Sequence, residues 1–201
     1  MTKTWNPSHI KEYHTDAYIV TSNWELEFDD SLGVAKWIPT APFQPAIVEI
    51  KSDHLPDDYF DASSMIVISD HLKQLLEDFK VHAEYLPIQV TYKGEKNNRH
   101  KFYCCNILKA VDCLDLKQGE YTFHQKAGFI DHIDKIKKLA IDENKAAPYH
   151  LFRIAKGAEY IVCVSDALAD KIEQLQLTGS IFVKPEDWTF CKQMDNSRGN
   201  N

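Results

Sequence analysis

The sequence predicts an α+β fold, with a mostly antiparallel or mixed sheet and two similar strand–helix–strand units that pack their helices on it. The stretches "MIVISDHLKQLLEDFKVHAEYLPI" (65–88) and "IVCVSDALADKIEQLQLTGSIFVK" (161–184) support this prediction. Both run from an apolar segment through Ser-Asp into a helical pattern and then a second apolar segment. In addition, 44% of the 201 residues are hydrophobic, which is enough for one substantial core or two small ones.

The N-terminal third shows weak periodicity. "DAYIVTS" (16–22) and "PAIVEIK" (45–51) are typical of short strands. Prolines break the remainder into loops, and we expect "DHLPDDYFDASS" (53–64) to be a polar connector. We therefore predict that residues 1–61 form an acidic, aromatic-rich region packed on a main α+β domain at 62–190.

The first strand–helix–strand unit begins with the apolar run "MIVI" (65–68), which predicts a short buried strand. Ser69 or Asp70 can cap the next helix by accepting a hydrogen bond from a free N–H of its first turn. The run "AEYLPIQVTYK" (83–93) then predicts a second strand. The helix has one apolar stripe with helical spacing, formed by Leu72, Leu75, Leu76 and Phe79.

A turn and a long strand are expected next. "GEKNNRH" (94–100) offers little that a core could bury, so we predict a turn there. "KFYCCNILKAVDCLDL" (101–116) is apolar and rich in strand-forming residues. We predict that it is the central strand and forms a hairpin with 85–92.

Residues 121–144 are ambiguous. Strand signals surround 121–124, and the apolar residues after them fit either a helix or a strand; we favour a strand at 136–142. "HLFRIAKGAEYIVCVS" (150–165) predicts two strands joined by a Lys-Gly-Ala turn, and the second unit follows. The polar C-terminus predicts a disordered tail at 191–201.

The two Ser-Asp phrases align on Ser69 and Ser165, with a leucine three positions on and a glutamate eight positions on in both copies. Duplication and chance both explain this match, because such units recur in many folds. A serine beside an acid also suggests a nucleophile. No histidine accompanies both copies, however, and there is no Gly-x-Ser-x-Gly turn, so we interpret both serines as helix caps.

Charge is unevenly distributed along the chain, whose formal net charge is -7. Residues 1–61 contain 11 Asp and Glu but only 4 Lys and Arg, whereas 62–201 contain 19 of each. Three of the four tryptophans, Trp5, Trp24 and Trp37, lie in the acidic part. This pattern fits an ordinary acidic surface, and it also fits a face for a basic partner with aromatic anchors among carboxylates.

No pattern in the sequence indicates a metal, a cofactor or a catalytic residue, and we expect none. The histidines are scattered, and no Cys-x-x-Cys pair is present. Adjacent Cys104 and Cys105 would point to opposite faces of a strand. Asp131, His132 and Asp134 are expected at a solvated edge. The seven glycines form no phosphate loop, and three arginines with a negative net charge argue against direct binding of nucleic acid.

The sequence is typical of a cytoplasmic protein. No apolar window is long enough to span a membrane, and the N-terminus lacks the apolar core of a signal peptide. The five cysteines lack the spacing of a disulfide framework, and four lie in apolar, strand-like runs. We therefore expect reduced, buried thiols.

Two polar signals lie inside apolar runs: Asp112 and Asp115 in "AVDCLDL", and Arg153 in "HLFRIAK". A buried guanidinium needs a partner, because an unpaired charge is costly to bury. We therefore predict a structural ion pair between Arg153 and Asp112 or Asp115. The alternative is a small-ligand site or an enzyme in which these three side chains act on a substrate.

In their order, four segments resemble immunity protein family 11 of bacterial polymorphic toxin systems: "IVISDHLKQLLEDF", "KFYCCNILKAVDCLDL", "IDKIKKLAIDEN" and "HLFRIAKGAEYIVCVSDALADKIEQLQLTGSIF". The Val-Asp-Cys-Leu-Asp stretch (111–115), the Leu-Phe-Arg triplet (151–153), the second Ser-Asp helix and the turn at Gly179 carry the match. The resemblance covers about residues 62–185.

The resemblance implies a protein that is encoded beside a secreted toxin and neutralises it by occlusion, without enzymatic activity. The expected partner is a cognate toxin domain, for which a basic, nuclease-like domain is one candidate. We expect no direct contact with nucleic acid or membrane, and a monomer or homodimer. An interaction module in a larger assembly is a further alternative.

We place the toxin contact on "NWELEFDDSLGVAKW" (23–37), because it combines carboxylates with aromatic residues. The alternative is that the two tryptophans belong to the core and the acids solvate a hairpin. The partner-binding residues that we predict are Trp24, Glu25, Glu27, Asp29, Asp30 and Trp37.

Overall fold

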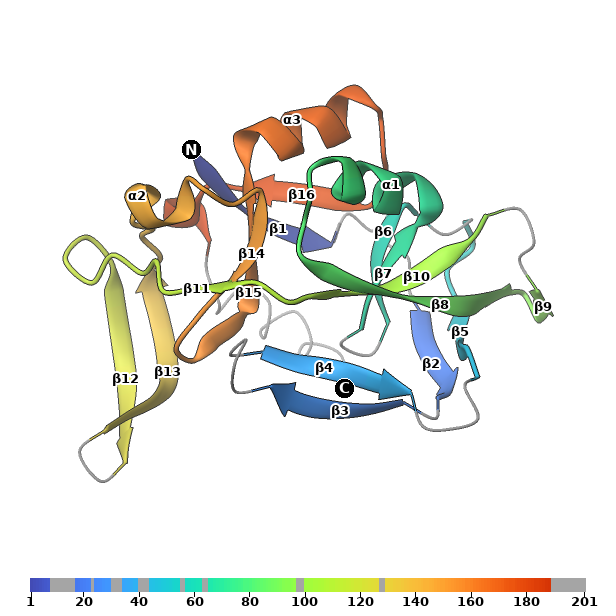
Figure 1. Cartoon of the computed structure of the whole chain (residues 1–201), viewed down its shortest axis with the longest axis horizontal. Coiled ribbons are helices and arrows are strands. Elements are labelled where there is room, and N and C mark those ends of the chain that lie inside the picture. The colour runs from blue at the N-terminus through green and yellow to red at the C-terminus, as the bar shows by residue number, and fades with distance from the viewer. Residues whose placement is uncertain are drawn as a thin grey trace.

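The structure, a computed structural model of the chain, combines two large sheets with two separate hairpins and few helices in the residues that it describes (Figure 1). The predicted α+β class is therefore confirmed. The tail predicted at 191–201 lies outside the described residues, which are 1–7, 17–22, 24–29, 34–39, 44–54, 57–62, 65–96, 100–126 and 129–188.

Six strands form a sheet that closes on itself, called the closed sheet below. Their order is β10–β7–β6–β2–β5–β8, and β8 pairs with β10 again. Apolar residues at alternate positions fill its core; in β5, Ala46, Val48 and Ile50 are buried. A short β9 (Glu95–Lys96) folds back on β8. The six strands are β2 (Ala17–Thr21), β5 (Ala46–Ile50), β6 (Tyr59–Ala62), β7 (Met65–Ser69), β8 (Ala83–Tyr92) and β10 (Phe102–Ile107).

A second sheet has five strands in the order β11–β14–β15–β1–β16. The first strand of the chain lies inside this sheet, antiparallel to both neighbours: Thr4 is opposite Cys163 on one side and Val183 on the other. The N-terminal segment is therefore built into a sheet made otherwise from the second half of the chain. The five strands are β1 (Thr2–Pro7), β11 (Ala110–Val111), β14 (Leu151–Ile154), β15 (Ala158–Ser165) and β16 (Ser180–Val183).

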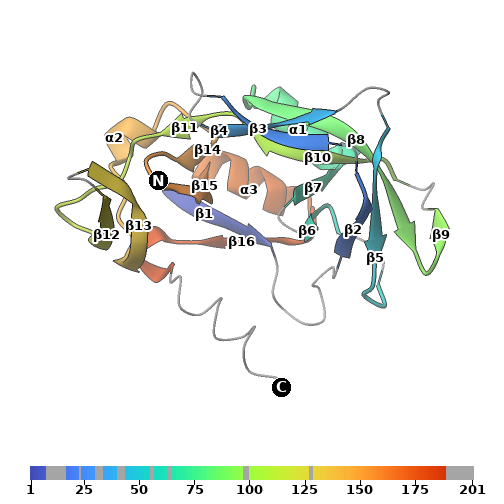
Figure 2. The ribbon, with the colours of Figure 1, turned by 90° about the horizontal axis from the view of Figure 1, so that it is seen from below.

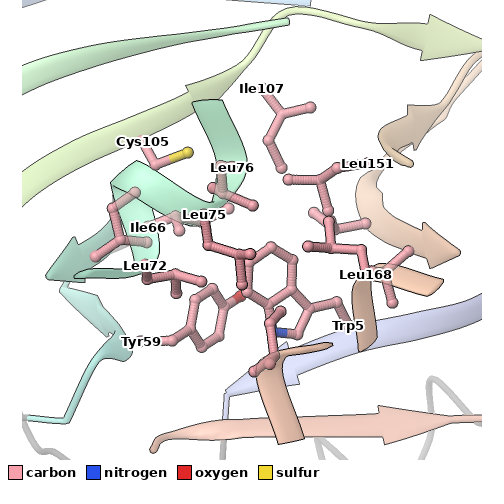
Figure 3. Close-up of a cluster of buried hydrophobic side chains, with 14 of the residues drawn as sticks. Trp5, Tyr59, Ile66, Leu72, Leu75, Leu76, Cys105, Ile107, Leu151 and Leu168 are labelled. Atoms are coloured by element: carbon pink, nitrogen blue, oxygen red, sulfur yellow. The ribbon is translucent and has the colours of Figure 1, made fainter. Parts of the chain in front are cut away.

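Two helices pack into one core between the sheets. Both α1 (Asp70–Asp78) and α3 (Asp166–Gln174) begin after a serine whose hydroxyl accepts an N–H of the first turn. Trp5 of β1 stacks on Tyr59 of β6 with ring centres 4.6 Å apart, which joins the sheets beneath the helices. Figure 3 shows this cluster, to which both helices contribute buried leucines, among them Leu72, Leu75, Leu76 and Leu168.

Two hairpins form two-stranded sheets of their own. One pairs β3 (Trp24–Asp29) with β4 (Val34–Pro39). The other pairs β12 (Glu120–Lys126) with β13 (Phe129–Lys138) and projects from one end of the molecule in both views (Figures 1 and 2). The short α2 (Glu143–Ala146) follows it, and a 3-10 turn, η1 (Pro185–Asp187), ends the described chain near β16.

Several predicted strands are confirmed. β2 and β5 match the runs at 16–22 and 45–51, and β8 pairs antiparallel with β10 as predicted for the hairpin. The two helices do not share one sheet, however, because α1 follows a strand of the closed sheet and α3 follows a strand of the five-stranded sheet. The equivalence of the two units stays a prediction.

Three boundaries differ from the prediction. The central strand expected at 101–116 ends at Ile107, because the chain then crosses to the five-stranded sheet and resumes there as β11. The connector expected at 53–64 contains β6, where buried Tyr59 and Phe60 lie among polar neighbours. The strand favoured at 136–142 ends at residue 138, and Ile141 makes only an isolated bridge.

Candidate functional site

The predicted contact segment forms the β3–β4 hairpin. The strands pair in register from Trp24 opposite Pro39 to Asp29 opposite Val34. Glu25, Glu27 and Asp29 therefore occupy alternate positions of one strand, and Trp37 lies in the other. Asp30 falls outside the described residues.

Trp24 holds this hairpin against the closed sheet. Its side chain is 7% exposed and belongs to the closed-sheet core. The indole N–H donates to the carbonyl oxygen of Gln44 at 2.9 Å, which satisfies the polar edge of a buried ring. This arrangement gives Trp24 a positioning role and fixes the beginning of the acidic strand.

Arg153 lies on β14 and is largely buried. Its Nε donates to the carbonyl oxygen of Ile107 at 3.3 Å, and its Nη1 donates to that of Glu159 at 2.8 Å. Burial lowers the pKa of the guanidinium from its usual value, while nearby Cys105 and Tyr59 act in the opposite direction. The Arg153 side chain thus links the end of β10 to β15 through the carbonyl oxygens of Ile107 and Glu159.

The two aspartates have other partners. Asp112 accepts a hydrogen bond from Lys156 Nζ at 2.6 Å, and both side chains are exposed. Asp115 accepts the backbone N–H groups of Lys117 and Gln118, closing a turn. The predicted ion pair is therefore wrong: neither Asp112 nor Asp115 pairs with Arg153. Asp112 follows β11 directly and pairs with Lys156 in the turn between β14 and β15.

The different partners of Arg153, Asp112 and Asp115 also argue against the alternative small-ligand or enzymatic site. A site built on these three side chains needs them to converge, and they do not. Among the residues that the structure describes, no group of three His, Cys, Asp or Glu side chains is arranged to hold a metal ion.

The described cysteines are free and buried: Cys104, Cys105, Cys113 and Cys163. Burial raises the pKa of Cys105 and of Cys113 to about 12, so these thiols stay protonated at neutral pH. A protonated thiol in a closed core is a packing residue and a poor nucleophile. Cys191 lies outside the described residues.

None of the helices in the described part of the chain combines the length and the apolar run that a membrane crossing requires.

The comparison with protein families identifies one match. The model of the immunity protein family Imm11 matches residues 5–187, a range that includes every helix and strand described above apart from the first three residues of β1. The match extends the resemblance seen at 62–185 to the N-terminal strands. No curated protein matches the sequence.

Proposed function

Since the chain belongs to the immunity protein family Imm11, we propose that it neutralises a cognate bacterial toxin by binding the toxin's active domain and covering its active site. The family match over nearly the whole chain carries this proposal. The complex forms in the cytoplasm of the cell that needs protection, with the immunity protein as a monomer or homodimer. The toxin belongs to a polymorphic toxin system used in competition between bacteria.

The acidic β3–β4 hairpin is the contact surface in this proposal. Residues 1–61 hold all of the excess negative charge of the chain, and the hairpin carries Glu25, Glu27 and Asp29 at alternate positions. Alternate positions of a strand share one face, which places the three acidic residues on the same side of β3. Buried Trp24 keeps the hairpin in place through its bond to Gln44. Trp37 is opposite Leu26, so its position alternates with those of the three acids, and it would contribute from the other face of the hairpin.

A basic active site is the target that fits this surface. A toxin that cleaves nucleic acid needs a positively charged cleft, and a row of carboxylates can occupy the cleft in place of phosphates. Opposite charges speed association and orient the two proteins, while buried aromatic groups supply affinity. The inhibitor then needs shape and charge but no catalytic group.

The test uses the toxin domain encoded beside the gene for this chain. Reversal of charge at Glu27, Asp29 and Asp30 to lysine should slow association at low salt by about tenfold or more and flatten its salt dependence, because rim charges act mainly on association rate. Stopped-flow mixing or surface plasmon resonance at several salt concentrations measures both. In co-expression, the variant should protect cells less than the wild-type protein does.

A matched control reverses three exposed acids elsewhere, Glu95, Glu173 and Asp187, with the same change in net charge. This control should associate more nearly like the wild-type protein. Equal loss in both variants would show a general charge effect and remove the hairpin as the contact. Failure of the wild-type protein to bind the toxin domain or to protect cells would contradict the proposed function itself.

A further inference from the structure

A pocket of about 510 Å³ lies between the end of α1 and the segment that leads into β14. The pocket lining includes Lys80, His82, Lys109 and His150, and no carboxylate is among its described lining residues. The whole chain has 30 acidic and 23 basic residues, so this local pattern runs against the overall charge. We propose that this pocket, called the basic pocket below, binds a small anion of the phosphate class.

A comparison with a second large pocket shows that the absence of carboxylates from the described lining is distinctive of the basic pocket. It has about 450 Å³ and lies at the beginning of α3. There the cations are matched by acids, and Asp166 already pairs with the amino group of Met1 and with Lys3. Its charged side chains are Lys3, Lys138, Lys184, Glu143, Asp166 and Glu186. A pocket that holds three carboxylates among its cations is poorly suited to an anion, whereas the basic pocket has no carboxylate in its described lining.

The two lysines of the basic pocket are available to a ligand. Neither Lys80 nor Lys109 forms an ion pair with a carboxylate in the described ranges, whereas Lys156 and Lys73 have carboxylate partners at 2.6 Å. Lys109 Nζ lies 4.4 Å from the ring centre of Tyr149. This contact orients the ammonium group without neutralising it.

His150 is fixed at the rim by two contacts. Its Nδ1 lies 2.9 Å from the hydroxyl oxygen of Ser165, and its ring forms a T-shaped pair with that of Phe79, with ring centres 4.9 Å apart. These contacts hold the imidazole plane and leave Nε2 for a ligand oxygen.

Hydrogen bonds of the main chain hold the segments that form the basic pocket. The N–H of Val81 donates to Leu76, that of Leu108 donates to His82, and that of Ser165 donates to His150, each at 2.9 Å. The N–H groups of Phe79 and Lys80 also donate to carbonyl oxygens of the last turn of α1. These bonds satisfy carbonyl oxygens at the negative end of the helix, which would otherwise repel an anion. A site held in this way loses little entropy on binding.

Phosphate fits these groups better than a single carboxylate does. It carries up to two negative charges and offers several acceptor oxygens to donors from three directions, here α1, the segment before β11 and the segment before β14. The pocket also has the size that small-molecule sites commonly have.

The test is a titration of the ¹⁵N-labelled full chain, followed by NMR, with sodium phosphate and then pyrophosphate. Sodium chloride and sodium glutamate at the same ionic strength are the references. We expect saturable shifts at 79–82, at Lys109 and at 149–151, larger with phosphate than with glutamate. Non-saturable shifts, shifts elsewhere, or the same response to chloride would overturn the proposal. A stronger response to glutamate would point to acidic peptides and would also overturn it.

Two pairs of substitutions complete the test. Lys80→Gln with Lys109→Gln should weaken phosphate binding by about tenfold or more, since each removes a charge-assisted contact. The matched control, Lys135→Gln with Lys137→Gln, removes two exposed lysines of β13 and should bind as the wild-type protein does. If the pocket double variant does not fold, Lys80→Gln alone is the variant to measure, because Lys80 is exposed. Wild-type affinity in the folded pocket variant would contradict the proposal. No toxin is present, so the outcome is independent of the proposed function.

Discussion

The caps of α1 and α3 make the same bond in different surroundings. Ser69 and Ser165 each accept the N–H three residues on, at 3.2 and 3.3 Å. Ser69 is only 2% exposed, and its hydroxyl donates to Asp58 at 2.6 Å. Ser165 is less buried and contacts His150 at the rim of the basic pocket. The repeated phrase therefore predicts where a helix begins, but the surroundings determine how much each cap matters.

Asp58 makes the first cap part of a junction between the two sheets. Its other oxygen accepts the N–H of Thr178, which follows α3, at 3.0 Å. The N–H of Tyr59 donates to the carbonyl oxygen of Thr178 at 3.1 Å. The beginning of α1 and the exit from α3 are thus tied together, whereas the side chain of Ser165 contacts the N–H of Leu168 and the ring of His150.

Breaking that junction at Gly179 should have the largest effect on stability. Gly179 has φ +88°, and an added Cβ would overlap the carbonyl oxygen of Tyr59. Strain and overlap in Gly179→Ala should lower the free energy of unfolding by about 3 kcal/mol, measured by urea denaturation. Gly94→Ala is the control: its φ is +79° but the space around it is open. It should cost about 1 kcal/mol. Equal losses would show that the close approach to Tyr59 is unimportant.

Removing each cap in turn should give an intermediate effect and test the comparison directly. Ser69→Ala should lower the free energy of unfolding by about 2 kcal/mol, and Ser165→Ala by about 1 kcal/mol. The first substitution costs more because it also removes the hydroxyl that donates to Asp58 Oδ1. Urea denaturation of both variants measures the difference. A double-mutant cycle of Ser69→Ala with Asp58→Ala should show coupling. Equal losses at the two serines, without coupling, would contradict the assigned difference.

The smallest effect is expected at Asp166, the first residue of α3. Burial raises the pKa of this carboxyl, but the hydrogen bond and charge of the Met1 amino group, with Lys3, lower it more, so the net shift is downward. The stabilisation is therefore present above the unfolded pKa and is lost as the pH falls through the lower folded pKa. Asp166→Asn should lower the thermal midpoint at pH 7, and the difference should shrink as the pH falls through the lowered folded pKa.

Asp70→Asn is the matched control for that measurement, because Asp70 has the same position in α1 and no ion pair within the described residues. Its thermal midpoint should differ from that of the wild-type protein by less than the Asp166 variant does at pH 7. The same pH dependence in both variants would show that the pairing with the amino group does not stabilise α3.

Local features of this chain could be predicted from the sequence because local rules determine them. A serine before a helix and apolar residues at spacings of three and four identify α1 and α3 without knowledge of their partners. Alternating or continuous apolar runs likewise identify β2, β5 and β7. These features depend on residues close together in the chain.

The sheet partners and the basic pocket could not be predicted, because they join distant segments. No residue near Thr4 in the sequence indicates that β1 lies between β15 and β16. The core residue Tyr59 has aspartates on both sides in the sequence, so it resembles part of a polar loop. The sequence predicts a carboxylate partner for Arg153, because a buried guanidinium needs hydrogen-bond acceptors. Backbone carbonyl oxygens serve as those acceptors instead. The basic residues of the pocket come from three segments, and no single window contains their pattern.

The place of β1 has a consequence for how the protein is made. β1 leaves the ribosome long before β15 and β16, its two neighbours in the sheet, so its hydrogen bonds wait until both of those strands have been made. A nascent chain that stops after α2 would keep β1 without either neighbour. The five-stranded sheet is thus assembled late, and cells would obtain it only from chains that extend through β16.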